Sequence, residues 1–503
     1  MPIIAISLIT VVSAVVGLNV ALPEIARATG ATQTELTWII DAYTVVFAAL
    51  LFFAGALGDR YGRKRLLAIG LVIFGLAAVG GTFVTNPTQL IVVRALMGLG
   101  AAAVMPTTLS VITTSFPEEE RPRAIGAWVG MAGAGAIIGL LFTATLLEFF
   151  AWQSFFWLNV VLATMATIGT LLRIPESIDA QPPTLDLVGG LLSLVGVGGI
   201  VFGIIEGPDR GWSDPATVAA LAAGLTGLAA FVIWELRRPE PLLDPRLFRQ
   251  RGFTTGSVAI AATFYCWFGV IFTVIQYLQF VVGYSPLHAV AALLPIPFVL
   301  LPTARNAPKL AARIGFRRTV PLGLLLLAAG LFVLSRVTVE LSYPTFALGL
   351  VLSASGMGLS GTPSTSAVTA SLPPAKQGVA SAMNDTAREL GAALGIAVLG
   401  SALAQTYRTA MLPAVAGLPD QAAQAVLGSV AFTQAPELSR LGARGHQLVT
   451  QGHQAFVDGV GVALVIAAIV ALCLAVVVFL AAPSGDRGGP GHDADRSELA
   501  AGR

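Results

Sequence analysis

Apolar residues in this chain come in blocks of about twenty, the length that an α-helix needs to cross a hydrocarbon core of about 30 Å. The chain has 503 residues, of which 55% are hydrophobic and only 11% are charged. A soluble domain has roughly 25% charged residues, and this chain has too few to cover its apolar surface in water. The pattern therefore excludes a soluble globular fold and predicts an all-α polytopic membrane protein.

Breaks at charged residues, prolines and glycines divide the apolar blocks into fourteen predicted transmembrane helices. The spans form a set of six, a pair and a second set of six, at residues 3–23, 36–57, 66–84, 89–113, 125–147, 153–172, then 186–206 and 216–236, then 254–282, 286–304, 319–336, 344–366, 379–404 and 458–482.

The basic residues test this count independently, because Lys and Arg concentrate in short cytoplasmic loops. Short loops after odd-numbered spans carry only Arg27, Arg210 and Arg336. Loops after even-numbered spans carry the remaining clusters: Arg60, Arg63, Lys64 and Arg65; Arg121 and Arg123; Arg173; Arg237, Arg238, Arg246, Arg249 and Arg251; Arg305, Lys309, Arg313, Arg317 and Arg318; and Lys376. This alternation predicts a multi-pass protein of the cell membrane with both termini in the cytoplasm.

Two basic turns occupy equivalent places in the two six-span sets. The first is GALGDRYGRKR, and the second is RNAPKLAARIGFRR, about 250 residues later. Related halves with an inserted helical pair are typical of duplicated transporters, whose substrate sites lie between the halves. The predicted organisation is a bundle at 1–175, an inserted pair at 176–240, a second bundle at 241–482 with a long external loop at 406–457, and a disordered tail at 483–503.

GALGDRYGRKR resembles the loop signature of the major facilitator superfamily, G-x-L-x-D-R-x-G-R-[KR]-[KR], at every position. The fourteen spans, with the sequences NVALPEI, RALMGLGAA and MNDTARELGAALGIAVLGS, resemble its fourteen-helix drug:proton antiporter family. This resemblance covers essentially all of residues 10–480. It implies two six-helix bundles plus two inserted helices, and export of drugs in exchange for protons.

The gating residues predicted in the first turn are Gly55, Gly58, Asp59, Arg60, Gly62 and Arg63. Glycines allow two helices to approach closely. Asp59 can cap a helix, or pair with Arg60 or with a neighbouring helix, as a latch that breaks when the halves rock. The alternative is that the basic residues only orient the helices. Because the second turn has Ala312 where the first has Asp59, mutation of Asp59 should impair transport more than mutation of Arg313 or Arg317.

Ionisable residues within the spans are costly to bury, so each is a candidate for proton coupling. Asp41 lies about one turn into the second span and could take up a proton from outside and release it inside. Arg94, in the fourth span, fits the family's arginine of the central polar network and needs a carboxylate or carbonyl partner. The alternative for both residues is a position at the membrane interface.

Three further charged residues lie in the thirteenth span, in NDTARELGAALG. Asp385 and Glu389 are four residues apart and share a helix face, which suits a proton site or a cationic substrate. Arg388 could equally neutralise them in a structural cluster.

The ninth span is rich in aromatic and amide side chains, which suit apolar and cationic substrates. We expect substrate contacts from Tyr265, Trp267, Phe268, Gln276 and Tyr277, although packing against lipid is an equal alternative for any one of them. Phe264 and Gln279 lie in the same stretch.

Two segments depart from the family pattern. The acidic residue expected in the first span is replaced by Ala14 in SAVVGLNVALP. The G-P pair and following glycines expected in the fifth span read GAGAIIGLLFTAT, with Leu140 in place of proline and Thr143 and Ala144 in place of glycines. The missing proline removes a kink thought to favour export.

These observations predict a proton-coupled exporter of hydrophobic or cationic drugs or natural products that works by alternating access. Its partners would be a small-molecule substrate, protons and the lipid bilayer, with no cofactor, no metal and no nucleic acid, and the chain would act as a monomer. One alternative is a symporter or a dedicated exporter of one metabolite. Another is a non-transporting sensor. No constellation of catalytic side chains predicts an enzyme.

Overall fold

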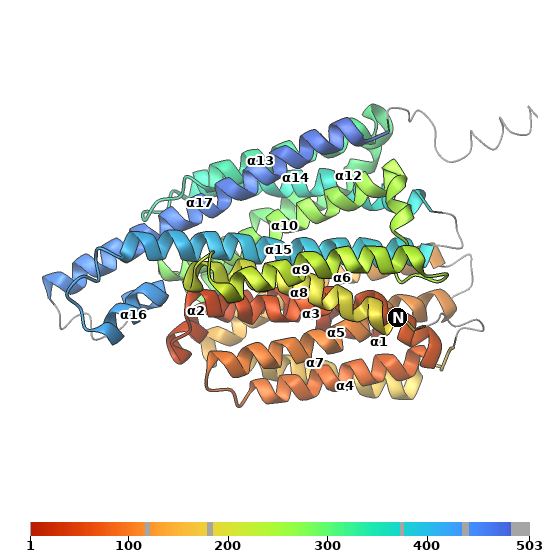
Figure 1. The fold of residues 1–503 in the computed structure, drawn as a ribbon, viewed down its shortest axis with the longest axis horizontal. Coiled ribbons are helices and arrows are strands. Elements are labelled where there is room, and N and C mark those ends of the chain that lie inside the picture. The colour runs from red at the N-terminus through yellow and green to blue at the C-terminus, as the bar shows by residue number, and fades with distance from the viewer. Residues whose placement is uncertain (1, 116–120, 179–184, 373–376, 435–441, 484–503) are drawn as a thin grey trace, which may run out of the picture.

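The computed structural model is a bundle of long helices that lie nearly side by side (Figure 1). It describes residues 2–115, 121–178, 185–372, 377–434 and 442–483, and side chains at 113–130, 132–134 and 377–378 are not described. Within these ranges the chain forms helices and no strands. The predicted tail at 483–503 and the basic residue Lys376 fall outside the described residues, apart from residue 483.

The helices follow one another with short connections. In chain order they are α1 (Pro2–Val16), α2 (Leu18–Thr29), α3 (Gln33–Tyr61), α4 (Arg63–Gly81), α5 (Pro87–Ser115), α6 (Arg121–Phe149), α7 (Ser154–Arg173), α8 (Leu187–Arg210), α9 (Pro215–Arg237), η1 (Pro245–Arg249), α10 (Arg251–Phe280), α11 (Pro286–Ala291), α12 (Pro295–Ile314), α13 (Phe316–Leu334), α14 (Tyr343–Ala370), α15 (Gln377–Met411), α16 (Asp420–Gly428), η3 (Val430–Gln434) and α17 (Ala443–Ala481).

The helices agree with the fourteen predicted spans. Among the described residues, twelve segments are long and apolar enough to cross a membrane, and the bent pair α1 and α2 gives a thirteenth. The fourteenth is α6, a helix of 29 residues whose described apolar part is Gly135–Phe149. Many large apolar side chains on these helices face outward, such as Leu76 (66% exposed), Phe142 (57%) and Phe298 (76%). Such a surface is stable in contact with lipid and not in water.

Two spans and one external segment differ from their predicted form. The first span bends by 47° between α1 and α2, at Gly17. The tenth is divided into α11 and α12 by a short break that ends at Pro295. The external segment predicted at 406–457 is shorter, because α15 continues to Met411 and α17 already begins at Ala443.

The helices form two groups with an inserted pair beside the contact between them. We call α1–α7 the first half and α10–α17 the second half. The halves meet where α3 contacts α15, where α2 contacts α10 and where α6 contacts α11. Of the inserted helices, α8 contacts α3 of the first half and α15 of the second, and α9 packs on α8.

Two equivalent turns define one end of the bundle. Gly62 joins α3 to α4 with a φ of +110°, and Gly315 joins α12 to α13 with a φ of +83°, both in a region that favours glycine. Each glycine N–H donates to the carbonyl four residues earlier, at Gly58 and Ala311. We call this end of the bundle the inner end, and the end with α2, α11 and α16 the outer end. The two basic turns therefore share the same backbone geometry.

Candidate functional site

The carboxylate of Asp59 at the inner end pairs with the residue that begins the next helix. Arg63 Nη2 lies 2.8 Å from Asp59 Oδ1, and Arg63 Nε donates to the same oxygen at 2.9 Å. Of the expected alternatives, this geometry matches pairing with a neighbouring helix, because Arg63 is the first residue of α4, while Arg60 lies over the ring of its neighbour Tyr61. Gly58 and Gly55 of α3 approach Thr107 and Pro106 of α5, as expected for close helix packing.

A residue that the sequence motifs did not single out holds this turn to the segment after α7. Glu176 accepts a hydrogen bond from the backbone N–H of Lys64 at 3.1 Å and lies 3.4 Å from Arg65 Nε. The N–H of Arg63 donates to the carbonyl of Ser177 at 3.0 Å. The first basic turn is thus tied within the first half by a carboxylate 112 positions away along the chain.

The two turn glycines allow a matched stability test. A Cβ at Gly62 would lie 2.6 Å from Glu176 Oε1, whereas a Cβ at Gly315 would meet nothing within 4 Å. Both alanine variants should lose about 1–2 kcal/mol from the positive φ. Only Gly62→Ala should also displace Glu176, so we expect it to lower the thermal unfolding temperature more. Equal unfolding temperatures for the two variants would contradict the role given to Glu176.

Arg94 is fully buried and connects three helices of the first half. Its Nε donates to the carbonyl of Ile39 at 2.9 Å, and its guanidinium lies 4.3 Å from the centre of the Tyr43 ring. The hydroxyl of Tyr43 donates to the carbonyl of Val11 at 3.1 Å. Neither terminal nitrogen of Arg94 has a hydrogen-bond partner among the described residues. The Arg94 side chain is therefore enclosed by protein and does not extend to water.

Asp41 is also fully buried, and neither of its oxygens has a hydrogen-bond partner within the described chain. Because a helix turns by about 100° per residue, Asp41 lies roughly 200° around α3 from both Ile39 and Tyr43, which contact Arg94. The two buried charges thus occupy opposite sides of α3 and do not form one site.

The side of α3 that carries Asp41 faces α8 and α15. Val45, one turn further along, belongs to an apolar cluster with Val197 and Val201 of α8 and Ala393 and Ala397 of α15. Trp38, one turn before Asp41, packs against the same cluster. The carboxylate therefore lies in an apolar seam between the first half, the second half and the inserted pair.

The charged residues of α15 are partly paired. Arg388 lies 3.8 Å from Asp385 Oδ1, and its guanidinium is 4.7 Å from the centre of the Phe264 ring. Glu389 is 8% exposed, and its Oε2 has no hydrogen-bond partner in the part of the chain that is described. Arg388 thus pairs with Asp385, and Glu389 is buried one helical turn beyond Asp385.

The predicted substrate residues of α10 fall on different faces. Phe268 stacks with Phe264, and Trp267 is partly buried. The backbone of Tyr265 lies against Gly395 of α15. Gln276 donates back to the carbonyl of Phe272 at 3.0 Å, and the Tyr277 hydroxyl donates to the carbonyl of Thr338 at 2.7 Å. Of the five residues, only Phe268 is brought by this geometry to the charged cluster of α15, through Phe264.

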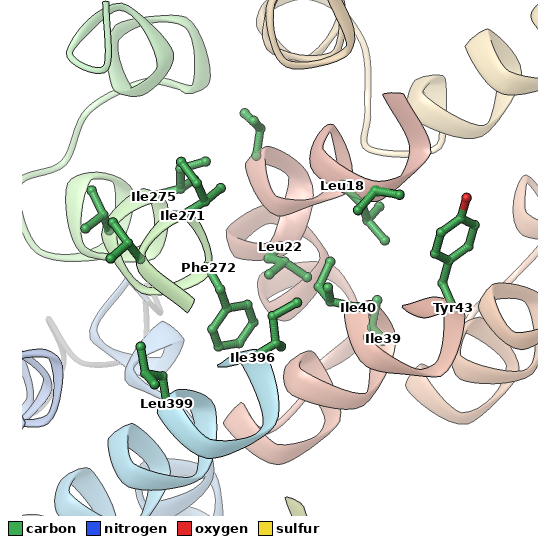
Figure 2. Close-up of a cluster of buried hydrophobic side chains, with 14 of the residues drawn as sticks. Leu18, Leu22, Ile39, Ile40, Tyr43, Ile271, Phe272, Ile275, Ile396 and Leu399 are labelled. Carbon is green, nitrogen blue, oxygen red and sulfur yellow. The ribbon is translucent and has the colours of Figure 1, made fainter. Parts of the chain in front are cut away.

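The halves are sealed at the outer end by apolar side chains. Figure 2 shows buried side chains of α2, α3, α10 and α15 where the halves meet: Leu18, Leu22, Ile39, Ile40, Ile271, Phe272, Ile275, Ile396 and Leu399. Tyr43 lies apart from them and points towards the first half. Near this cluster, Gln279 of α10 donates to the carbonyl of Val20 at 3.0 Å. Glu148 of α6 accepts hydrogen bonds from Ser285 and from the N–H of Leu287. Among the described residues, the polar contacts that join the two halves directly lie at this end, so the outer face is closed.

A bundle of two repeated halves with unpaired charges buried near their contact is the architecture of a secondary transporter. Residues 4–396 match the Major Facilitator Superfamily. The chain belongs to this superfamily, and it is therefore a multi-pass membrane transporter that acts on a small molecule.

Two relatives align along nearly the whole chain. The multidrug resistance protein Stp of Mycobacterium tuberculosis is 32% identical over 472 residues, which are 92% of this chain and 87% of that protein. The multidrug efflux pump LfrA of Mycolicibacterium smegmatis is 35% identical over 463 residues, which are 92% of this chain and 91% of that pump. These relatives agree with the resemblance to the drug:proton antiporter family.

The fold is similar to that of a solved bacterial homologue of the human lysosomal transporter Spinster, in an inward-facing and unoccupied conformation. The TM-score is 0.63 at 18% identity, and the alignment covers 96% of this chain and 98% of the other. At this identity the likeness concerns the fold alone.

Proposed function

We propose that the protein exports hydrophobic or cationic drugs or natural products in exchange for protons, by alternating access. The observation that carries the proposal is a pair of buried carboxylates, Asp41 and Glu389, on the α3 and α15 helices where the halves meet. Both oxygens of Asp41 and Oε2 of Glu389 have no hydrogen-bond partner among the described residues. A buried, unpaired carboxylate is costly when charged, so its protonation can be coupled to a change in its surroundings. The relatives Stp and LfrA are named for multidrug resistance and multidrug efflux, and these names support outward transport.

We assign proton coupling to Asp41, Arg94, Asp385, Arg388 and Glu389 in different roles. Asp41 and Glu389 carry the proton. Arg94 supports the packing of the first half through Ile39 and Tyr43. The pairing of Arg388 with Asp385 leaves Glu389 as the carboxylate of α15 that is free to exchange a proton.

The cargo site of the proposal lies on α10 and α15. Phe264 and Phe268 are stacked rings that offer flat apolar surface beside the charged residues of α15. Aromatic faces and a nearby carboxylate suit a flat organic cation. Tyr265, Trp267, Gln276 and Tyr277 of α10 stay as further candidate substrate contacts in the proposal.

Efflux of a fluorescent organic cation tests the proposal. Cells that lack their own efflux pumps would express the protein, be loaded with ethidium, and be followed as the dye leaves, with and without a protonophore. We expect efflux that stops when the protonophore collapses the proton gradient. Efflux that continues unchanged without the gradient would contradict proton coupling.

The other parts of the proposal follow from the charge pattern and the family. The inner end faces the cytoplasm, with both termini on that side, because it carries the basic turns. The chain acts as a monomer, and it carries out transport and no enzymatic reaction. A sensor without transport activity is disfavoured by relatives that are named for efflux and resistance.

Asp59→Asn should reduce the rate of efflux by about threefold to tenfold, a loss that corresponds to about 0.7–1.4 kcal/mol of activation free energy and is of the size expected for a partly buried ion pair. The variant keeps the size of the side chain but loses the ion pair with Arg63. Arg313→Gln is the matched control, because it alters the equivalent turn, where Ala312 replaces the acid. Initial rates of dye efflux measure both. An equal loss in the two variants would contradict the special role of the first turn.

A further inference from the structure

The inserted helix α8 packs against α3 over the stretch from Trp38 to Phe53. At the outer end, Trp38 Nε1 donates to Glu206 Oε1 at 2.8 Å, and the Trp38 ring lies 5.7 Å from the ring of Phe202. Towards the inner end, Gly190 packs against Phe53. Because these contacts hold one register from one end of the span to the other, α8 is fitted to the first half as an additional wall.

The contact of α8 with α15 differs from its contact with α3, because it has an apolar part and, further outward, a polar part. The apolar part runs outward from Leu390 to Ala397 of α15. Beyond it, the Ser401 hydroxyl donates to the carbonyl of Ile204 at 2.6 Å, and Arg408 Nη1 lies 2.9 Å from Asp209 Oδ1. The recorded polar bonds between α8 and the second half are therefore at the outer end, where the two halves also seal each other directly.

Asp41 lies behind this contact. Its position on α3 falls between Trp38, which contacts α8, and Thr37, which lies against Gly400 of α15. The seam that buries Asp41 is thus closed by three helices, and separation of α8 from α15 would open it from the outer end.

We propose that α8 moves with α3 as part of the first half, and that its contact with α15 is an outer gate that controls access to Asp41. The proposal rests on the proposed function only in taking Asp41 as a proton carrier. It gives α8 a function in transport. The helix enlarges the surface through which the first half contacts α15, and the ion pair between Asp209 and Arg408 is the outermost interaction of the gate.

Distances between spin labels test the movement without any substrate. Exposed positions are available in α2 (Ala28), in the turn after α8 (Ser213) and in α15 (Thr409). Cysteines would be placed there in pairs, with Cys266 and Cys473 replaced by alanine. Pulsed electron paramagnetic resonance would then measure the three distances in lipid nanodiscs at acidic and alkaline pH.

We expect the distance between positions 28 and 409 to show a second, longer population. The distance between 213 and 409 should lengthen under the same conditions. The distance between 28 and 213 should stay unchanged. Lengthening between 28 and 213 with a constant distance from 213 to 409 would overturn the proposal, because α8 would then move with the second half. No change in any of the three distances would overturn it too, since the outer gate would not open.

Cross-linking connects the movement to transport. A bifunctional thiol reagent that joins cysteines at 209 and 408 should abolish dye efflux, and reduction should restore it. Joining cysteines at 38 and 206, between α8 and α3, should leave the efflux rate of that variant as it was before cross-linking. Inhibition by the second bridge and not by the first would contradict the proposal. If the unmodified protein exports no dye, the proposed function fails while the distances still decide the movement of α8.

Discussion

Asp41→Asn is expected to abolish proton-driven efflux, with the rate reduced at least about tenfold, a change of 1.4 kcal/mol or more in the activation free energy. Asparagine has the same shape but cannot take up and release a proton. The buried carboxylate has no partner among the described residues, so its removal breaks no ion pair. We therefore expect the variant to insert and fold normally, with a thermal unfolding temperature at least equal to that of the unaltered protein.

Asp420→Asn is the matched control, because Asp420 is an exposed residue of α16. Its efflux should equal that of the unaltered protein. The decisive comparison is dye efflux with and without an imposed pH gradient in all three proteins. Gradient-dependent efflux by Asp41→Asn at the normal rate would remove Asp41 from the coupling and leave Glu389 as the candidate.

Arg94→Lys is expected to reduce efflux by about tenfold or more although the positive charge is kept. The planar guanidinium donates to the Ile39 carbonyl, and its central carbon at the same time lies 4.3 Å from the centre of the Tyr43 ring. A lysine ammonium can make one of these contacts but not both in the same geometry. Loss of the charge-assisted hydrogen bond should also cost about 1.5–3 kcal/mol of stability.

Two measurements separate these effects: the thermal unfolding temperature and the efflux rate per molecule of folded protein. Arg249→Lys, at an exposed position of η1, is the control and should change neither. Arg94→Lys with normal efflux would show that a positive charge alone is enough at this position, contrary to the geometry described above.

The sequence predicts the membrane spans well because each span is a long run of apolar residues whose length is set by the bilayer. Blocks of apolar residues and the placement of Lys and Arg are both set by the bilayer, so fourteen spans and two repeated halves could be recognised without a structure. Bends are less visible. Gly17 and Pro295 stand at breaks in the first and tenth spans, but similar residues elsewhere, such as Pro106, lie within a continuous helix.

The candidate site was predicted only in part. Asp41, Arg94 and Glu389 could be recognised because charges are costly in a membrane. Their arrangement could not, because it depends on which helices face each side of α3. The partner of Asp59 and the docking of Glu176 on the first turn depend likewise on a contact between distant segments. No motif in the sequence of α8 indicates that this helix helps to enclose Asp41.

The central claim is that cargo and protons cross in opposite directions through one carrier. Purified protein in sealed proteoliposomes, with a pH-sensitive dye inside and an organic cation added outside, allows both movements to be followed at once. We predict that an imposed proton gradient drives cation transport against the proton flow, and that Asp41→Asn loses both movements together. Cation and proton moving in the same direction, or cation transport with no proton movement, would contradict the account.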